Sequence, residues 1–302
     1  MLLERMSSGL KLPVRFVEGT ARRASYAYKV YEIRKRDGGS RQVAHPARPL
    51  KALQRWLLRN VIERWPVHDA AYGYVAGRNI HQHAARHAAS GYLLRIDFAS
   101  FFPSITARDI DTFLATQPPG TTDWTDDDRR IFVQLVCKSG ALTIGAPTSP
   151  ALSNALCFQL DRLCTALAAD KGLVYTRYAD DLFFSTTTPD VLKSVPKALD
   201  DILSKLDTPS RLTINSKKER HSSRRGRRQV TGIVLSSDGR AVLGRGRKRY
   251  IRRQIHRIDS LQPAERASLR GLIAFATDVE PQFINALILK YGRKRVIAAM
   301  TQ

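Results

Sequence analysis

The chain has 302 residues, 43% of them hydrophobic, so it can bury a core but is too short for several domains of ordinary size. Its 50 Lys and Arg against 27 Asp and Glu leave a formal net charge of +23, which predicts a polyanionic partner such as nucleic acid. The three cysteines lack C-x-x-C spacing, which disfavours a disulfide framework or a structural zinc site. No uncharged apolar stretch could span a bilayer and no signal peptide is evident, so we expect no membrane partner and a cytoplasmic location.

The first part of the chain predicts a hairpin, two helices and a strand. Residues 28–45 alternate apolar and polar side chains and break at Asp37-Gly38-Gly39, which is typical of a basic β-hairpin. Apolar residues at helical spacing predict helices over 50–64 and 80–89. The apolar run 92–97 ends in Asp97, which indicates a buried strand with a carboxylate at its end.

Further along, residues 173–185 alternate around Tyr178-Ala179-Asp180-Asp181, which predicts two strands that meet at a tight turn. Helices are expected on either side of this hairpin at 109–116, 124–138, 150–169 and 189–206. The C-terminal part is expected to hold an extended segment at 212–215, a strand at 229–236 and helices at 250–258, 263–277 and 281–297.

The acidic residues of these strands suggest a chemistry. Phosphoryl transfer to a sugar hydroxyl requires charge to be neutralised on the attacking and leaving oxygens, and two Mg²⁺ ions held by carboxylates do this. Asp97 and the pair Asp180-Asp181 suit such a site if their strands are neighbours. An Asp-Asp pair in a turn is most often ordinary solvated turn chemistry, but the flanking residues Leu182-Phe183-Phe184 predict burial, where an unpaired carboxylate is costly.

Six blocks of motif residues follow one another along the chain. They are the hairpin 28–41, the strand end 96–105, the loop 145–154, the turn 178–181, the segment 212–218 and Val230-Thr231-Gly232. In these blocks and their order the chain resembles the bacterial reverse transcriptases, and among them the retron reverse transcriptases, over nearly its whole length.

The resemblance implies an α+β fold of the right-hand polymerase type, with palm, fingers and a helical thumb. The expected division is an N-terminal region with fingers at 1–92, a palm at 93–112 and 145–236, a helical fingers insertion at 113–144, and a basic helical thumb at 237–302.

Within the first two blocks, the resemblance implies nucleotide-binding residues. Lys35 and Arg41 of the hairpin would hold the triphosphate of the incoming nucleotide, which agrees with the affinity of a Lys and an Arg fork for polyphosphates. A solvated basic hairpin is the alternative. Phe98 is assigned to the nucleotide site and Phe102 to a steric gate that excludes a 2′-hydroxyl, whereas Phe101 is expected to be a core aromatic.

The third and fourth blocks imply contacts to nucleotide, template and primer. Gly145 would contact the nucleotide, Pro147 and Ser149 would support the template and primer, and Tyr178 would lie against the primer end. The chain departs from the family pattern at Ile144, where a Gln is common, which implies altered handling of the nucleotide but not inactivity.

The catalytic residues that the resemblance implies are carboxylates and one lysine. Asp97, Asp180 and Asp181 would be the Mg²⁺ ligands for two ions, with Asp181 in a supporting role, and deoxynucleoside triphosphates would be the substrates. Lys218 would protonate the pyrophosphate leaving group, and the neighbouring Lys217 is the alternative acid.

Two features point to a retron enzyme and to RNA. Val230, Thr231 and Gly232 match a signature associated with retron enzymes and are assigned to a primer grip, although such a tripeptide is common by itself. His83 stands where the family has an Asn in an Asn-Ala-x-x-His region. The basic residues expected to grip the RNA backbone are Arg245, Arg247, Lys248, Arg249, Arg252 and Arg253, although a charge run is usually only a solvated surface.

The implied biology is the reverse transcription of a cognate structured RNA that serves as template and primer. Synthesis would begin at an internal 2′-hydroxyl and leave a single-stranded DNA product, with a separate effector protein in antiphage defence and a host RNase H that removes the template. A reverse transcriptase of a group II intron, a diversity-generating system or an abortive-infection system is the alternative. A catalytically idle RNA-binding scaffold is the alternative of another class.

Overall fold

In the computed structural model, residues 2–34 and 38–301 are described, and the chain divides into two compact units. The first unit comprises Met1–Gly77, Arg95–Phe183 and Lys193–Arg220. The second unit comprises Arg78–Leu94, Phe184–Leu192 and His221–Gln302. Within the described ranges, no helix has both the length and the apolar character to cross a membrane.

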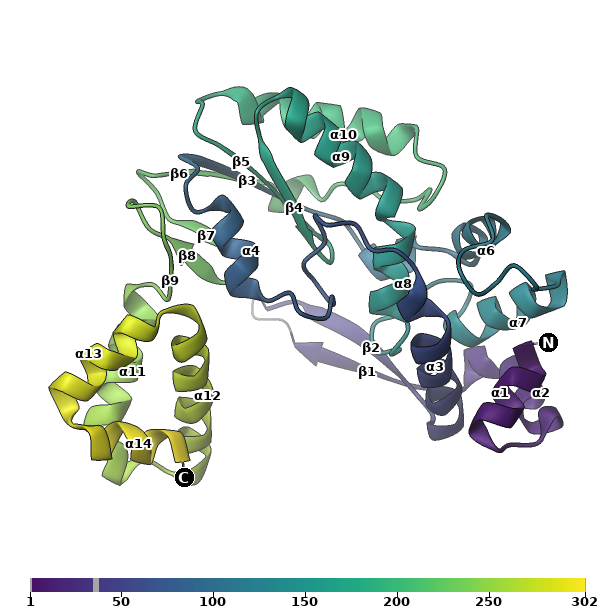
Figure 1. The fold of residues 1–302 in the computed structure, drawn as a ribbon, viewed down its shortest axis with the longest axis horizontal. Helices are drawn as coiled ribbons and strands as arrows, with labels where there is room; N and C mark the ends of the chain where they lie inside the picture. Colours follow the sequence, from purple (N-terminus) through teal and green to yellow (C-terminus); the bar gives the residue numbers. More distant parts are fainter. Residues whose placement is uncertain (1, 35–37, 302) are drawn as a thin grey trace. The chain divides into compact units, whose positions relative to one another are not determined.

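Helices at the beginning of the first unit pack around leucine side chains. Helices α1 (Leu2–Leu10), α2 (Val14–Arg22) and α3 (Arg48–Asn60) contact one another and α7 (Asp126–Val136) (Figure 1). Leu50, Leu53 and Leu57 recur every three or four residues along α3 and are fully buried. The α-helix expected over 50–64 ends earlier, at Asn60, and the single turn Ile62–Arg64 that follows is a 3-10 helix.

The expected hairpin is confirmed as β1 (Tyr28–Arg34) and β2 (Ser40–Pro46), which pair antiparallel with Tyr28 opposite Pro46. Most of β1 is exposed to solvent. Gln54 of α3 holds the base of the hairpin, because its side-chain amide donates to the Tyr28 hydroxyl and to the Leu135 carbonyl, each at 2.8 Å. Burial raises the pKa of Tyr28 to about 12, so the phenol stays neutral at the foot of the hairpin.

The central helices of the first unit differ from expectation at two places. The helix predicted over 150–169 is two helices, α8 (Ser149–Leu156) and α9 (Phe158–Asp170), because the backbone of Cys157 leaves helical geometry. The helix predicted over 189–206 begins as the 3-10 turn Val191–Ser194 and continues as α10 (Val195–Ser204), with Pro196 in the first turn where proline is tolerated. The expected helix at 109–116 is α6 (Ala107–Ala115).

A four-stranded sheet has the order β4-β5-β3-β6. These strands are β4 (Val174–Tyr178), β5 (Asp181–Thr186), β3 (Tyr92–Asp97) and β6 (Arg220–Ser223). The short helix α5 (Phe101–Ser104) follows β3, and α9 packs on β4. The segment expected to be extended at 212–215 forms no regular strand: it makes an isolated bridge between Ile214 and Phe98, and the 3-10 turn Ser216–Lys218 follows.

The second unit contains α4 (Ile80–His87), a three-stranded sheet and a group of four helices. The sheet has the order β7-β8-β9, from β7 (Arg228–Val230), β8 (Ile233–Leu235) and β9 (Ala241–Val242), and α4 packs against all three strands. The four helices contact one another and are α11 (Arg245–His256), α12 (Pro263–Val279), α13 (Pro281–Tyr291) and α14 (Arg293–Thr301) (Figure 1).

Two predictions for the second unit are wrong in the same way. The single strand expected over 229–236 is a hairpin, because Thr231 and Gly232 have φ values of 44° and 87° and turn the chain between β7 and β8. The single helix expected over 281–297 breaks at Gly292, where a φ of 82° ends α13. A residue with positive φ stops a regular element, and hydrophobic periodicity does not reveal that backbone angle.

Candidate active site

Backbone hydrogen bonds bring Asp97 and Asp180 together at one edge of the sheet. Asp97 is the last residue of β3 and is 4% exposed, and β5 is the neighbouring strand, as the sequence required. The Phe98 amide donates to the Asp180 carbonyl at 3.0 Å, and the Asn215 amide donates to the Asp97 carbonyl at 2.8 Å. The end of one strand and the tip of a hairpin are therefore held side by side.

The turn that presents Asp180 is confined by its neighbours. Tyr178 ends β4, Asp181 begins β5, and between them Ala179 has a φ of 55°, in the left-handed region. A Cβ at Gly73 would lie only 2.8 Å from the Ala179 nitrogen, so only glycine allows this approach. The side-chain amide of Asn154 donates to the Gly73 carbonyl at 2.8 Å and anchors that segment to α8.

The charges at the site are crowded. Burial raises the pKa of Asp180 above its ordinary value, and the negative charge of Asp97 adds to the rise. Burial likewise raises the pKa of Asp181 to about 6, although Arg95 opposes this. The Lys218 ammonium contacts both carboxylate oxygens of Asp97 at 3.1 and 3.2 Å. The structure thus places the candidate acid Lys218 against a carboxylate, and its proton-transfer role stays a prediction.

Asp181 is held by an arginine that the sequence did not single out. Arg95 lies on β3, and its guanidinium donates three hydrogen bonds of 2.8 to 3.0 Å to the two carboxylate oxygens of Asp181. The same guanidinium lies 6.0 Å from the centroid of the Phe183 ring. Asp181 therefore has a protein cation as its partner, whereas burial leaves the charge of Asp180 poorly compensated.

Two of the three predicted Mg²⁺ ligands, Asp97 and Asp180, form a pair of carboxylates that suits this ion. Among residues 2–34 and 38–301, no three His, Cys, Asp or Glu side chains form a group that could hold a metal ion. Mg²⁺, however, is usually bound by one or two carboxylates together with substrate phosphates and water. Asp97 and Asp180 supply that pair, and the raised pKa of Asp180 shows that a nearby cation would stabilise it.

The predicted nucleotide-binding residues are distributed around this edge. Lys35 lies outside the described residues. Arg41 lies opposite Ile33 on the hairpin, and its charge lowers the pKa of Asp180 in opposition to burial. Phe98 is 2% exposed and stacks on Phe101 at 6.0 Å between ring centroids, so its ring is part of the core. Phe102 is half-buried, with its ring 5.4 Å from that of Phe101.

The loop before α8 is joined to the hairpin through backbone atoms. The Ala44 amide donates to the Ile144 carbonyl at 2.8 Å. This contact between the loop and the hairpin uses the Ile144 backbone, so it does not depend on which side chain stands at position 144. A Cβ at Gly145, whose φ is 109°, would lie 2.6 Å from the Ala44 carbonyl oxygen. Pro147 is half-buried and Ser149 is buried at the first position of α8. Gly145 is therefore required by close packing of the chain, independently of any nucleotide.

A fully buried ion pair supports the turn from behind. Arg177, on β4, and Asp161, on α9, have no exposed side-chain surface and form hydrogen bonds of 2.8 and 2.6 Å. Arg177 also donates to the Ala179 carbonyl at 3.1 Å, and the Tyr175 hydroxyl donates to Asp161 at 2.7 Å. Sequence reasoning missed this network, although an arginine within an apolar strand beside the motif was a detectable signal.

The predicted primer-grip residues lie in the second unit. Val230 is fully buried, and Thr231 and Gly232 form the turn between β7 and β8. The Thr231 hydroxyl lies 3.4 Å from Nδ1 of His83, which is fully buried on α4, and burial lowers the pKa of His83 to about 3. Arg247 of α11 donates to the Gly232 carbonyl at 2.6 Å. This turn thus connects α4 to the helical part of its unit.

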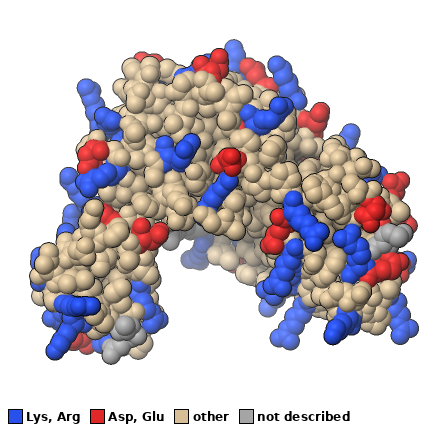
Figure 2. All heavy atoms as spheres, viewed as in Figure 1, with Lys and Arg blue, Asp and Glu red and all other residues tan. Residues whose placement is uncertain are grey.

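The six predicted RNA-binding residues fall into two groups. Lys248 is half-buried and forms an ion pair with Glu280 at 2.5 Å. The Arg247 guanidinium lies 5.1 Å from the centroid of the Phe275 ring. Both basic side chains therefore have partners within the protein. The other four are exposed on α11: Arg245, Arg249, Arg252 and Arg253. Figure 2 shows that Lys and Arg outnumber Asp and Glu on the visible face, in keeping with the net charge of +23.

Comparison with known proteins shows the family of this chain. Residues 33–244 match the family model described as reverse transcriptase (RNA-dependent DNA polymerase). The retron Ec83 reverse transcriptase of Escherichia coli is 37% identical over 89% of this chain and 88% of that protein. The retron Ec86 reverse transcriptase of Escherichia coli is 32% identical over 99% of this chain and 93% of that protein.

The fold also resembles a solved structure of distant sequence. A telomerase from Candida albicans, in complex with a fragment of telomeric RNA, superposes with a TM-score of 0.50 at 9% identity. The match covers 91% of this chain and 61% of that chain. At this level of identity the similarity concerns the fold alone.

Proposed function

This chain belongs to the reverse transcriptases, and among them to the retron reverse transcriptases, and we propose that it copies a cognate structured RNA into single-stranded DNA. It is an RNA-directed DNA polymerase, and the expected α+β fold of the right-hand polymerase type is confirmed. The proposal further holds that the same RNA supplies the primer, through an internal 2′-hydroxyl.

The observation that carries the catalytic part of the proposal is the juxtaposition of Asp97 and Asp180. These two carboxylates would hold Mg²⁺, which when bound neutralises charge on the reacting phosphates. Arg95 keeps Asp181 in a supporting position through its bidentate hydrogen bonds. In the proposal, Lys218, whose ammonium lies 3.1 Å from Asp97, would give a proton to the leaving pyrophosphate, and Lys217 is the alternative acid.

Substrate handling is assigned to groups around these carboxylates. Arg41 and Lys35 would bind the triphosphate, and Phe102 would lie under the sugar and exclude a 2′-hydroxyl. The turn 230–232 would support the primer, and the exposed arginines of α11 would contact the RNA backbone, because guanidinium groups bind phosphates in a bidentate manner. A separate effector protein, a host RNase H, a bacterial cytoplasmic location and a role in antiphage defence complete the proposal.

Substitution of Asp180 tests the catalytic assignment. Asp180→Asn keeps the shape of the side chain but removes a ligand charge, so we expect DNA synthesis on a primed RNA template to fall roughly 10³-fold or more. Binding of RNA by the same variant should stay close to that of the unaltered chain. Asp126→Asn, at a side chain that is 94% exposed, is the matched control and should leave synthesis unchanged. Synthesis retained by Asp180→Asn would refute the site.

The identity of the template is tested separately. Nucleic acid that copurifies with the chain would be sequenced after treatment with a debranching enzyme and without it. A DNA joined to an internal 2′-hydroxyl of its own RNA template supports the retron proposal. An unbranched DNA copy would instead favour a system of the group II intron, diversity-generating or abortive-infection kind.

A further inference from the structure

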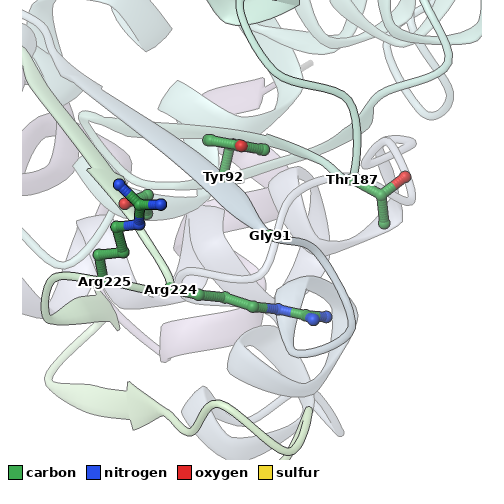
Figure 3. Close-up of a pocket in the computed structure, with 6 residues that line it drawn as sticks. Gly91, Tyr92, Thr187, Arg224 and Arg225 are labelled. Atoms are coloured by element: carbon green, nitrogen blue, oxygen red, sulfur yellow. The ribbon is translucent and has the colours of Figure 1, made fainter.

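A pocket of about 550 Å³ lies in the second unit, where β3 begins and where β5 and β6 end. Its lining consists of Gly91, Tyr92, Thr187, Ser223, Arg224 and Arg225 (Figure 3). The catalytic carboxylates occupy the other ends of the same strands, because Asp97 ends β3 and Asp181 begins β5. All six lining residues belong to the second unit, whereas Asp97 and Asp180 belong to the first, so the pocket is distinct from the catalytic site.

The floor of the pocket is held rigidly by arginine side chains. Arg224 donates from its backbone amide to the Gly91 carbonyl and from its guanidinium to the Ala89 carbonyl, both at 3.0 Å. The buried guanidinium of Arg228 donates to the Ser90 carbonyl and, at 2.7 Å, to the Ser236 carbonyl. Three successive carbonyls of the turn 89–91 thus accept hydrogen bonds from the β6–β7 segment, which fixes the direction in which Arg225 leaves the backbone.

The charge of the pocket is positive and uncompensated. Its lining contains two arginines and no acid, and Arg227 follows on the same turn. Arg224, Arg225 and Arg227 are exposed, and no Asp or Glu among the described residues forms an ion pair with them. In Figure 3 the guanidinium groups of Arg224 and Arg225 point apart, so Arg225 is not engaged with the carbonyls that hold Arg224.

We propose that this pocket binds a backbone phosphate of the folded RNA, outside the segment that is being copied, with Arg225 as its principal ligand. A guanidinium suits this role because it can donate two parallel hydrogen bonds to one phosphate, and Ser223, which precedes it on the same segment, adds a hydroxyl to the lining. RNA is the expected source of the phosphate, because the nucleotide being added is bound at the opposite ends of β3 and β5, whereas a folded RNA extends beyond its copied segment. The inference rests on the proposed function, in which a structured RNA is the substrate.

Arg225→Gln tests the pocket, because it removes the charge while Arg224 continues to hold the turn. The probe is RNA transcribed from the sequence recovered with the purified chain, and binding to the full chain is measured at several salt concentrations. We expect the affinity to fall roughly tenfold. The slope of log affinity against log salt should decrease by about 0.7 to 0.9, the value for one lost phosphate contact. Arg225→Lys, which keeps the charge, should recover part of the affinity.

The control and the second readout separate this inference from the proposed function. Arg108→Gln, on an exposed position of α6, should change neither the affinity nor the slope. Extension of oligo(dT) on poly(rA) by the unaltered chain tests the proposed polymerase activity separately from the pocket. Two results would overturn the RNA assignment. One is an unchanged salt slope in Arg225→Gln. The other is displacement of the RNA by inorganic triphosphate from the unaltered chain but not from Arg225→Gln. Failure of the unaltered chain to extend oligo(dT) would instead count against the proposed function.

Discussion

The buried pair of Arg177 and Asp161 offers the sharpest test of how the active-site turn is supported. Asp161→Asn preserves the shape of the side chain but leaves the Arg177 charge without its partner in a fully buried position. Burial by itself would lower the pKa of Arg177, but the attraction of Asp161 raises it above its ordinary value, so the guanidinium is charged and Asp161 is the carboxylate that compensates it. Breaking a buried pair from one side costs about 3–5 kcal/mol.

That cost is large compared with the roughly 5–15 kcal/mol by which folded domains are stable. The assay is urea unfolding followed by tryptophan fluorescence, because all three tryptophans, Trp56, Trp65 and Trp124, belong to the first unit and report its unfolding. We expect the unfolding midpoint of Asp161→Asn to move to lower urea with little change in the slope of the transition.

The double variant Asp161→Leu/Arg177→Met separates stability from positioning. Apolar replacement of a whole buried ion pair is often close to neutral, so the double variant should be more stable than Asp161→Asn. Its DNA synthesis should nevertheless stay impaired, because the Ala179 carbonyl loses the donor that holds the turn of Asp180. A loss of less than about 1 kcal/mol in Asp161→Asn would refute the reasoning, because that value is typical of solvent-exposed pairs.

Two further predictions concern glycine and histidine positions. Gly145→Ala should destabilise the first unit by about 1–3 kcal/mol in the same fluorescence assay, because a Cβ would lie 2.6 Å from the Ala44 carbonyl oxygen at a φ of 109°. Gly246→Ala, in helix α11 of the second unit with nothing within 4 Å of the added Cβ, should instead be neutral or stabilising by up to about 1 kcal/mol in hydrogen exchange of that helix, and a loss there would contradict the argument. Since burial lowers the pKa of His83 to about 3, its stabilising contribution is present above the unfolded pKa near 6.5 and is lost as the pH falls toward 3. His83 should therefore contribute about 2 kcal/mol to the protection that α4 loses in hydrogen exchange between pH 6.5 and 5, beside the contribution of His87, whose pKa is also lowered by burial. The loss should be smaller by that amount in His83→Gln, and equal profiles would exclude a buried neutral imidazole at position 83.

The sequence by itself determined the kind of chemistry and most of the elements that bear it. Asp97 and Asp180 stand at the ends of apolar runs, and a carboxylate at such a position predicts a strand end or a turn without knowledge of distant contacts. The hairpin 28–45 and the strands on either side of Asp180 were likewise predicted, because alternation of side chains and turn residues is a local property.

Only the tertiary structure decided which distant residues serve those carboxylates. Arg95 meets Asp181, Lys218 meets Asp97, and Arg177 meets Asp161 through folding that brings separate strands and helices together. Local patterns also failed where a single residue interrupts a regular element, as at Cys157 and at the turn 231–232. Periodicity records which side chains face the core, whereas backbone angles and partners depend on the packing of the whole chain.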